Sequence, residues 1–408
     1  MTHEATEHGK GGVYSSKGKE FTRDTRYIND RIVAHPTAPD EWPVEPGRYR
    51  LIAARACPWA NRSLIVRRLL GLEDALSVGM PEPTHDADSW TFGLDPGGVD
   101  PVLGIHKLKD AFLARFPDYS RGITVPAIVE VSSGKVVTND FAQITEDFAT
   151  QWTAFQREGA PDLWPAERLD ELREVMQRIY TEVNNGVYRC GFAGSQDAYD
   201  AAYERLWTAL DWLEQRLTDR RYLMGESITE ADVRLFTTLV RFDPVYHGHF
   251  KCNRNKLTEM PALWGYARDL YQTPGFGDTV DFEQIKEHYY VVHTDVNPTG
   301  IVPAGPLLDD LCAGSLSALP RARRDDALPF GPGRRRVRQA ARAGSSSRPG
   351  RNRRHRAPAA SARGPACSGR LAQHRRSRLK LRAAAARHLP GRGHERPPGC
   401  RSRPGEAA

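Results

Sequence analysis

The feature that most restricts the fold of this 408-residue chain is a short apolar segment that leads directly into a Cys-Pro pair. Residues 48–54 read RYRLIAA, which predicts a short buried strand. Residues 57–60 read CPWA, and apolar residues at helical spacing follow until Gly71. Proline is favoured in the first turn of a helix, and glycine commonly follows the last turn. The sequence therefore predicts strand, turn and helix, with Cys57 at the start of the helix.

Two further strands and a series of helices are expected after this unit. Residues 123–131 and 135–138 predict two strands joined by a Ser-Gly turn. Pro126 is expected at the first residue of a strand or in a cis peptide bond, because it cannot donate to a sheet. Long amphipathic helices are then predicted at 165–184, 198–216 and 229–242, with shorter ones after Pro261 and Phe282. The expected fold class is α/β followed by all-α.

Composition and periodicity divide the chain into four segments. The second segment contains a Pro- and Gly-rich insertion without steady periodicity, at 80–120. The predicted segments are an N-terminal arm at 1–45, a β/α domain at 46–152, a helical domain at 160–306 and a tail at 307–408.

The basic character of the chain comes from its tail. Residues 321–408 hold 24 Arg and one Lys against four acidic residues, so the net charge of +7 leaves −14 for residues 1–320. An acidic body argues against a nucleic-acid-binding core. The tail has too little apolar surface to fold, so disorder is expected. Two interpretations stay open: an out-of-frame extension, favoured by the excess of Arg over Lys, or a disordered basic arm that binds nucleic acid or an acidic partner.

Features that the sequence lacks restrict the expected cellular location and the expected cofactors. It contains no apolar run long enough to span a bilayer, and its N-terminus is not a secretory signal, so a cytoplasmic protein without membrane attachment is expected. The six cysteines form no CxxC pair and no Cys/His cluster at zinc spacing. Neither a disulfide framework nor a metal site is expected.

Cys57 is the strongest candidate for a reactive group. A cysteine at the first turn of a helix lies near unpaired backbone N–H groups, which favour the thiolate and predict a lowered pKa. A dithiol oxidoreductase would need a second cysteine at position 60, where this chain has Ala60. An external small thiol must then resolve the intermediate, which indicates a monothiol mechanism. The alternative is a buried inert thiol, the interpretation preferred for Cys190 and Cys252.

An ordered set of motifs resembles one family, the glutathionyl-hydroquinone reductases, which are the Xi-class glutathione transferases. The resemblance covers roughly residues 20–306. It rests on the CPWA run and on five further segments: Trp90-Thr-Phe92, Gly122-Ile-Thr-Val-Pro126, Val183-Asn-Asn-Gly-Val-Tyr188, Leu223-Met-Gly225 and Asp295-Val-Asn-Pro-Thr-Gly-Ile-Val-Pro303.

The resemblance implies a thioredoxin-like N-terminal domain, a helical glutathione-transferase C-terminal domain and a homodimer. The implied activity is removal of the glutathionyl group from glutathionyl-hydroquinones, through a mixed disulfide on Cys57. No metal or bound cofactor is implied, and glutathione is the cosubstrate. Two alternatives from other classes are a conjugating transferase, which the cysteine disfavours, and a non-catalytic thioredoxin-fold binding module.

Positions that match the family pattern imply two groups of site residues. Trp90 would contact the glutamyl end of glutathione, Arg121 a carboxylate, and the Val125 backbone the cysteinyl part. The implied catalytic residues are Cys57, Tyr188 and Tyr289, and the implied thiol-binding residues are Trp90, Arg121, Val125, Pro126 and Asp140.

One position departs from the family pattern. Where the family carries Glu-Ser to hold the glutamyl end of glutathione, this chain has Asp140-Phe141. Phe141 has no side-chain donor, so the carboxylate of glutathione would lose a partner. A different low-molecular-weight thiol such as mycothiol is therefore the alternative cosubstrate, and the Arg-, Ala-, Gly- and Pro-rich tail suggests a GC-rich genome of the kind that mycothiol users often have.

Overall fold

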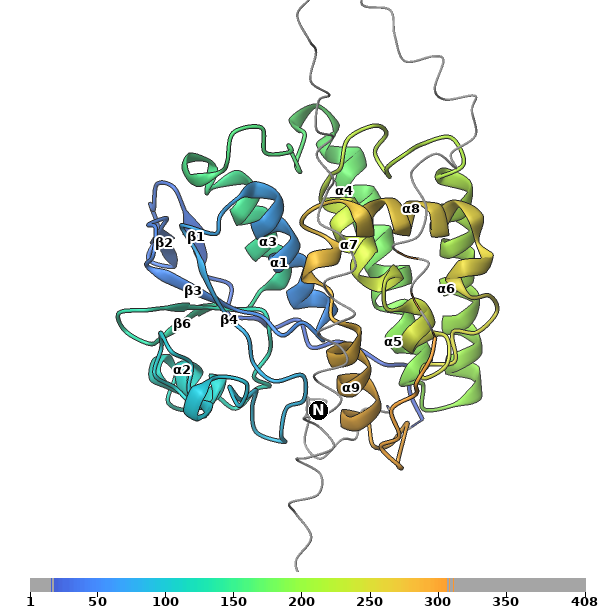
Figure 1. Ribbon diagram of the computed structural model, residues 1–408, viewed down its shortest axis with the longest axis horizontal. Helices are drawn as coiled ribbons and strands as arrows, with labels where there is room; N and C mark the ends of the chain where they lie inside the picture. The colour runs from blue at the N-terminus through green and yellow to red at the C-terminus, as the bar shows by residue number, and fades with distance from the viewer. Residues whose placement is uncertain (1–15, 17, 307, 309–310, 312–408) are drawn as a thin grey trace, which may run out of the picture. The chain divides into compact units, whose positions relative to one another are not determined.

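A computed structural model describes residues 16, 18–306, 308 and 311 (Figure 1). Apart from residues 308 and 311, the predicted tail at 307–408 lies outside this described part, and so do most of the first 17 residues. The strands are β1 (Arg31–Val33), β2 (Glu41–Pro43), β3 (Tyr49–Ile52), β4 (Ser77–Gly79), β5 (Ala127–Glu130) and β6 (Val136–Thr138).

A four-stranded mixed sheet forms the centre of the N-terminal half, in the order β4-β3-β5-β6. β3 pairs with β4 in parallel and with β5 antiparallel, and β5 and β6 form an antiparallel pair. Every residue of β3 and β5 is buried, as expected for the two central strands. β1 and β2 pair in parallel as a separate two-stranded sheet.

Helices accompany this sheet and then make up the C-terminal half. In Figure 1, α1 and α3 lie between the sheet and the helices α4 and α7, and α2 lies near the lower end of the sheet. The α-helices are α1 (Pro58–Leu70), α2 (Leu108–Arg115), α3 (Phe141–Thr150), α4 (Leu169–Arg178), α5 (Gly186–Gly191), α6 (Gln196–Arg216), α7 (Glu230–Leu239), α8 (Pro261–Gln272) and α9 (Phe282–Val292). Short 3₁₀ turns lie at Pro96–Gly98, Thr153–Phe155, Ala166–Arg168, Leu257–Glu259 and Gly277–Thr279.

The structure confirms the predicted strand, turn and helix around Cys57. Pro58 occupies the first turn of α1, and Gly71 ends the helix in the left-handed conformation with φ 71°. The Val125-Pro126 peptide bond is cis and immediately precedes β5. Asp140 caps α3, because its carboxylate accepts hydrogen bonds from the backbone N–H groups of Ala142 and Gln143.

Two of the three predicted long helices differ from the expectation at their C-terminal ends. The segment predicted at 165–184 begins with a 3₁₀ turn, continues as α4 and ends in the π-helical segment η4 (Ile179–Asn184). The segment predicted at 229–242 is α7, which is followed by the π-helical segment η5 (Phe242–Tyr246). Periodicity in the sequence cannot distinguish such widened turns from a regular helix.

The two halves are joined by buried polar contacts at the start of α1. Arg241, which follows α7 and is fully buried, donates to the backbone oxygens of Arg55 and Ala56. Asn61 donates to Thr279 Oγ1 at 2.7 Å. These bonds fix the cysteine loop against the helical half. Among the described residues, no helix is both long enough and apolar enough to cross a bilayer.

Candidate active site

Cys57 lies between the end of β3 and the first turn of α1. It is the N-cap residue of the helix and has extended backbone angles, φ −78° and ψ 122°. Its Sγ donates to the backbone oxygen of Val125 at 3.5 Å, across the cis bond that precedes β5. The thiol is half-buried and lines the pocket described below.

Burial raises the pKa of the Cys57 thiol, in opposition to the other groups around it. The backbone N–H groups of Ala60 and Trp59 and the charges of Arg241 and Arg23 lower this pKa, but burial outweighs them. The predicted lowering by the helix start is therefore wrong in its net direction. The reason is that the helix start is buried between the two halves of the protein.

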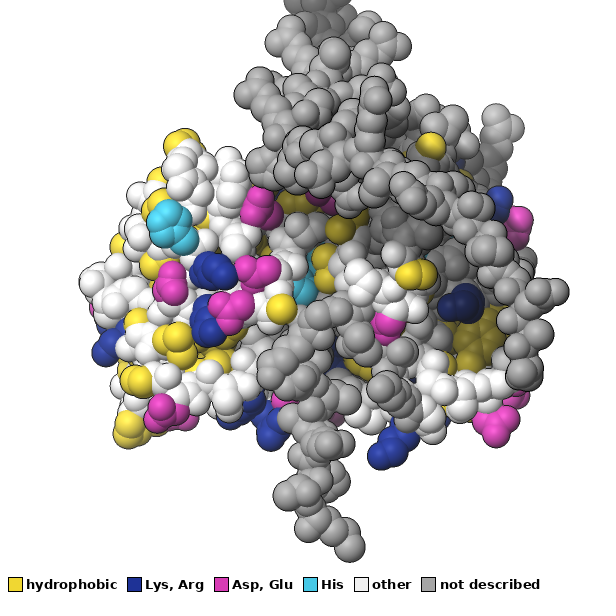
Figure 2. All heavy atoms as spheres, turned by 90° about the horizontal axis from the view of Figure 1, so that it is seen from below, with side chains coloured by type: hydrophobic (Ala, Val, Ile, Leu, Met, Phe, Trp, Pro, Cys, Tyr) yellow, Lys and Arg dark blue, Asp and Glu magenta, His cyan; other side chains and the backbone are white. Residues whose placement is uncertain are grey.

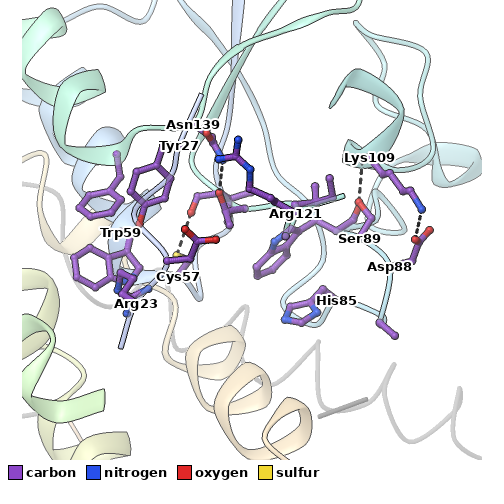
Figure 3. A pocket seen from close by; sticks show the side chains of 18 of the residues that line it. Arg23, Tyr27, Cys57, Trp59, His85, Asp88, Ser89, Lys109, Arg121 and Asn139 are labelled. Atoms are coloured by element: carbon purple, nitrogen blue, oxygen red, sulfur yellow. Dashed lines mark hydrogen bonds and ion pairs between the residues drawn. The ribbon is translucent and has the colours of Figure 1, made fainter. Parts of the chain in front are cut away.

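A pocket of about 550 Å³ brings together six of the eight predicted site residues (Figure 3). Its size lies in the usual range for small-molecule sites. The six that line it are Cys57, Trp90, Arg121, Val125, Tyr188 and Tyr289. Pro126 follows Val125, and Asp140 caps α3; neither lines the pocket.

Three tyrosine hydroxyls form a hydrogen-bonded cluster at the pocket. Tyr188, from α5, lies 2.6 Å from Tyr289, from α9, measured between the hydroxyl oxygens. The Tyr289 hydroxyl also lies 2.9 Å from that of Tyr246 in η5. Burial raises the pKa of all three phenols, so they are neutral donors at physiological pH. No pattern in the sequence predicts Tyr246 as a site residue, because its position beside Tyr188 and Tyr289 depends on the π-helical segment η5.

Trp90 packs against two histidines. Its ring lies 4.9 Å from that of His85 and is stacked on that of His288 at 5.5 Å and 13°. His288 Nδ1 donates to the backbone oxygen of Pro83 at 2.7 Å, which leaves Nε2 as the acceptor of a neutral imidazole. Burial lowers the pKa of His288 to about 3. No motif in the sequence points to His288, although it directly precedes Tyr289.

Arg121 and Phe141 both line the pocket. Arg121 donates to the backbone oxygen of Arg26, and its guanidinium lies near Asn139 in Figure 3. Phe141 is buried, and its ring lies 4.5 Å from that of Trp59 and 5.5 Å from that of Tyr27. An aromatic cluster therefore occupies the start of α3, where the family pattern has a side-chain donor.

The arm before β1 also contributes to the pocket. Phe21 is buried and stacks on Tyr188 at 6.2 Å. The guanidinium carbon of Arg23 lies 4.3 Å from the centre of a Trp59 ring and 5.0 Å from that of Tyr188. Arg23 was not predicted, since a lone arginine in a polar arm carries no signal in a single sequence.

Other charged side chains line the far end of the pocket. Lys109 lies beside Asp88, and Lys107 forms an ion pair with Asp86 at 2.8 Å. Figure 3 shows Lys109 and Asp88 at the end away from Cys57, and Figure 2 shows Lys and Arg side chains interspersed with Asp and Glu on one face of the molecule. Within the described residues, no group of three or more His, Cys, Asp or Glu side chains is arranged to hold a metal ion.

Comparisons with known proteins identify the family. The glutathione S-transferase N-terminal domain matches residues 56–151, and the C-terminal domain of the same family matches residues 196–269. Glutathionyl-hydroquinone reductase YqjG of Escherichia coli (strain K12) is 40% identical over 300 residues, which cover 72% of this chain and 91% of YqjG. The chain belongs to the glutathionyl-hydroquinone reductase family.

Further relatives agree with this assignment. Glutathionyl-hydroquinone reductase PcpF of Sphingobium chlorophenolicum is 42% identical over 265 residues, 64% of this chain and 84% of PcpF. The crystal structure of a glutathione transferase from Gordonia bronchialis is 69% identical, with a TM-score of 0.68, and covers 70% of this chain and 88% of that one. The structure of YqjG with glutathione bound is 42% identical, with a TM-score of 0.62, over 65% of this chain and 86% of that one.

These matches confirm the predicted fold class and the resemblance stated from the motifs. The N-terminal half is the thioredoxin-like domain of a glutathione transferase, and the C-terminal half is the helical domain of the same family. The named relatives of this chain are enzymes.

Proposed function

We propose that this protein is a glutathione-dependent reductase that removes the glutathionyl group from glutathionyl-hydroquinones through a mixed disulfide on Cys57. The observation that carries the proposal is the placement of one thiol, Cys57, and two hydrogen-bonded phenols, Tyr188 and Tyr289, on the same pocket. Cys190 and Cys252 are buried and do not line this pocket. Among the described residues, Cys57 therefore has no resolving partner there.

The reaction has two steps. In the first, the Cys57 thiolate attacks the sulfur of the conjugate, so a sulfur–sulfur bond forms and the carbon–sulfur bond breaks. The conjugate reacts as its keto tautomer, in which the ring carbon that bears sulfur has taken up a proton and the adjacent ring hydroxyl has lost one. When the carbon–sulfur bond breaks, its electron pair passes into the ring and restores the aromatic hydroquinone as an oxygen anion, which takes up a proton and leaves. In the second, the thiolate of a glutathione attacks the mixed disulfide, which yields glutathione disulfide and returns Cys57 to its starting state. The sulfur is oxidised and the ring carbon is reduced.

The pocket residues have distinct roles in this proposal. The Val125 backbone binds the cysteinyl part of the conjugate as an added strand would. Because the Cys57 thiol donates to the Val125 oxygen, a ligand amide that takes over this acceptor also removes a partner of the protonated thiol, which favours the thiolate. Trp90 and Arg121 contact the glutamyl end, and the phenols of Tyr188 and Tyr289 donate to a ring oxygen of the hydroquinone.

The test is turnover of glutathionyl-menadiol with glutathione, followed for the wild type and for Cys57→Ser. The wild type should release menadiol and form glutathione disulfide. Cys57→Ser should lose this activity, and mass spectrometry should detect a glutathionyl adduct on Cys57 of the wild type only. Cys190→Ser is the matched control and should keep activity. Turnover that survives Cys57→Ser would overturn the mechanism.

Mycothiol is the second candidate cosubstrate, on the observation at the start of α3. The Asp140 carboxylate accepts two backbone N–H groups there and does not line the pocket, and Phe141 lines it with an apolar ring packed on Trp59, so neither offers a side-chain donor for a glutamyl group. The same assay with mycothiol and its menadiol conjugate decides between the two thiols. A kcat/KM for glutathione at least tenfold above that for mycothiol would exclude this alternative.

Three further expectations stay predictions. They are the homodimer, the cytoplasmic location, and the division into an arm at 1–45, domains at 46–152 and 160–306 and a tail. The tail is tested by resequencing the locus and by searching for C-terminal peptides by mass spectrometry. Such peptides would exclude an out-of-frame extension.

A further inference from the structure

Arg23 brings a guanidinium group into the pocket from outside both domains. It lies in the arm before β1 and is held by a hydrogen bond from its Nε to Asn185 Oδ1 at 2.8 Å. Its guanidinium packs against the rings of Trp59 and Tyr188, both of which line the same pocket as Cys57. Figure 3 shows Arg23 beside Trp59 at the Cys57 end.

One nitrogen of this guanidinium lacks a partner. Arg23 Nη2 is buried and donates to no oxygen of the described residues, and no carboxylate among those residues forms an ion pair with Arg23. An unpaired buried donor on a charged group costs free energy unless a ligand completes it. Arg23 also lines the pocket, so a positive charge without a carboxylate partner faces the space in which a conjugate would bind.

Other arginines near Cys57 are already fully used or lie outside the pocket. Arg241 donates to four oxygens of the surrounding chain, including the Thr237 backbone, and does not line the pocket. Arg62 is fully buried beneath Trp59 and bonds to Asn184 through Nη2. Its Nε and Nη1 also lack partners, but Arg62 does not line the pocket. Arg121 lines the pocket on the other side of Cys57 from Arg23 in Figure 3, and donates to the backbone oxygen of Arg26.

We propose that Arg23 is a catalytic residue whose guanidinium stabilises the negative charge as it moves from the Cys57 sulfur to a ring oxygen of the leaving hydroquinone. The proposal rests on the reductase function proposed above. Before attack the charge is on Cys57 Sγ, and the guanidinium favours the thiolate. When the carbon–sulfur bond of the keto tautomer breaks, its electron pair passes through the ring to the keto oxygen, and the charge stays on this oxygen until it takes up a proton.

The positions of the phenols fit this role. Tyr188 lies between Arg23 and Tyr289, so a ring oxygen bound by the phenols is also within the field of the guanidinium. The charge of Arg23 lowers the pKa of both Cys57 and Tyr188 against the larger effect of burial. The charged and titratable groups that face Cys57 are Arg23 from the arm, Arg241 after α7 and the Tyr188 phenol from α5. A fixed donor that needs no reorganisation during reaction is an effective way to stabilise such charge.

The experiment measures the ionisation of Cys57 directly, without the reductase assay. The rate of alkylation of Cys57 by iodoacetamide is followed from pH 5 to 10 by mass spectrometry of its peptide, in the wild type, Arg23→Met and Arg23→Lys. The control is Arg254→Met, because Arg254 also lies over a tryptophan, at 4.2 Å from a Trp207 ring, but outside the pocket. kcat and KM for glutathionyl-menadiol are measured on the same proteins.

We expect Arg23→Met to raise the alkylation midpoint by about one pH unit, and so to slow alkylation at pH 7 roughly tenfold. Its kcat should fall roughly 10- to 100-fold with a smaller change in KM. Arg23→Lys should keep the midpoint close to wild type, because the charge is retained, but recover kcat only in part, because an ammonium cannot reproduce the fork of donors. Arg254→Met should match wild type in both measurements.

Two results would overturn the assignment of Arg23. The first is an alkylation midpoint of Arg23→Met that lies within a few tenths of a pH unit of the Arg254→Met midpoint. The second is an unchanged kcat in Arg23→Met. If Arg23→Met does not fold, Arg23→Lys decides, since a wild-type kcat there would contradict the role of the guanidinium fork. A wild-type protein that does not turn over the conjugate would instead overturn the reductase function, while the alkylation midpoints would still show whether Arg23 stabilises the Cys57 thiolate.

Discussion

The Tyr289 hydroxyl holds the phenol cluster together, because it contacts the hydroxyls of both Tyr188 and Tyr246. Tyr289 therefore helps to orient both phenols. A neutral phenol in this position can donate to a developing oxyanion and return the proton afterwards. The effect of a substitution at Tyr289 should therefore exceed the loss of one hydrogen bond.

Tyr289→Phe is expected to lower kcat for the glutathionyl-hydroquinone roughly 100-fold, because it removes one donor and releases the orientation of two others. Tyr290→Phe is the matched control: the neighbouring hydroxyl donates only to the Pro244 oxygen, at 3.2 Å, and does not line the pocket. Steady-state kinetics of both variants check the prediction. Equal kcat values for the two variants would contradict a role for the phenol cluster.

At the scale of elements, α5 presents Tyr188 to the pocket, and close packing holds it in place. Gly191 ends α5, and an added Cβ there would lie 2.3 Å from Phe250 Cγ. Phe250 in turn packs on Tyr188, with ring centres 5.4 Å apart. A substitution at Gly191 must therefore displace the ring that supports Tyr188.

Gly191→Ala is expected to lower the free energy of unfolding by about 1–3 kcal/mol, because the buried Phe250 ring cannot move aside without strain. Activity per folded molecule should also fall, as Tyr188 moves with Phe250. Gly265→Ala is the control: this glycine lies exposed within α8, and an added Cβ would meet nothing within 4 Å, so a gain of up to about 1 kcal/mol is expected. Urea denaturation of the two variants measures both effects. A Gly191→Ala protein as stable as wild type would show that Phe250 can give way.

The same elements show what a single sequence can and cannot predict. The helix from Pro58 to Gly71 follows from local signals, a proline at its start and a glycine at its end, and so does the position of Cys57. Tyr246 depends on a π-helical turn, which has no signature in the hydrophobic pattern. Arg23 reaches the pocket because Asn185, 162 residues later, accepts its hydrogen bond. Contacts of such separation are set by tertiary structure, so only the motif resemblance could predict how Tyr188 and Tyr289 meet.

At the scale of the whole described molecule, the pocket depends on both halves, because β3, β5 and α1 hold Cys57 and Val125 while α5 and α9 hold the two phenols. The C-terminal side of the pocket rests on buried histidines. His249 is 6% exposed, and its Nε2 lies 3.1 Å from Nδ1 of His293, which lines the pocket. Neutral imidazoles can share this hydrogen bond, whereas two imidazolium ions would repel each other.

These histidines predict a loss of stability in mild acid. Burial lowers the pKa of His249 to about 4, whereas a histidine of the unfolded chain titrates near 6.5. Between these values the unfolded state binds a proton that the folded state does not, so the free energy of unfolding decreases as the pH falls through this window. The decrease is about 1.4 kcal/mol per pH unit for one histidine, or about 2 kcal/mol between pH 7.5 and pH 5. Burial raises the pKa of Asp232 and Asp243, and these carboxyls act in the opposite direction.

A comparison of wild type with His249→Gln isolates the contribution of His249 to the pH dependence of the free energy of unfolding, because the two proteins share the buried carboxyls. The amide keeps a polar partner for His293 but does not titrate, so the variant should lose less stability than wild type between pH 7.5 and pH 5, by about 2 kcal/mol. His35→Gln, at an exposed position, should follow the wild-type pH dependence. Urea denaturation at the two pH values provides the measurement. The comparison uses the change in the free energy of unfolding between the two pH values, so it holds even if His249→Gln is less stable at every pH. Equal losses of this free energy in all three proteins would show that the buried pair takes up protons in the folded state.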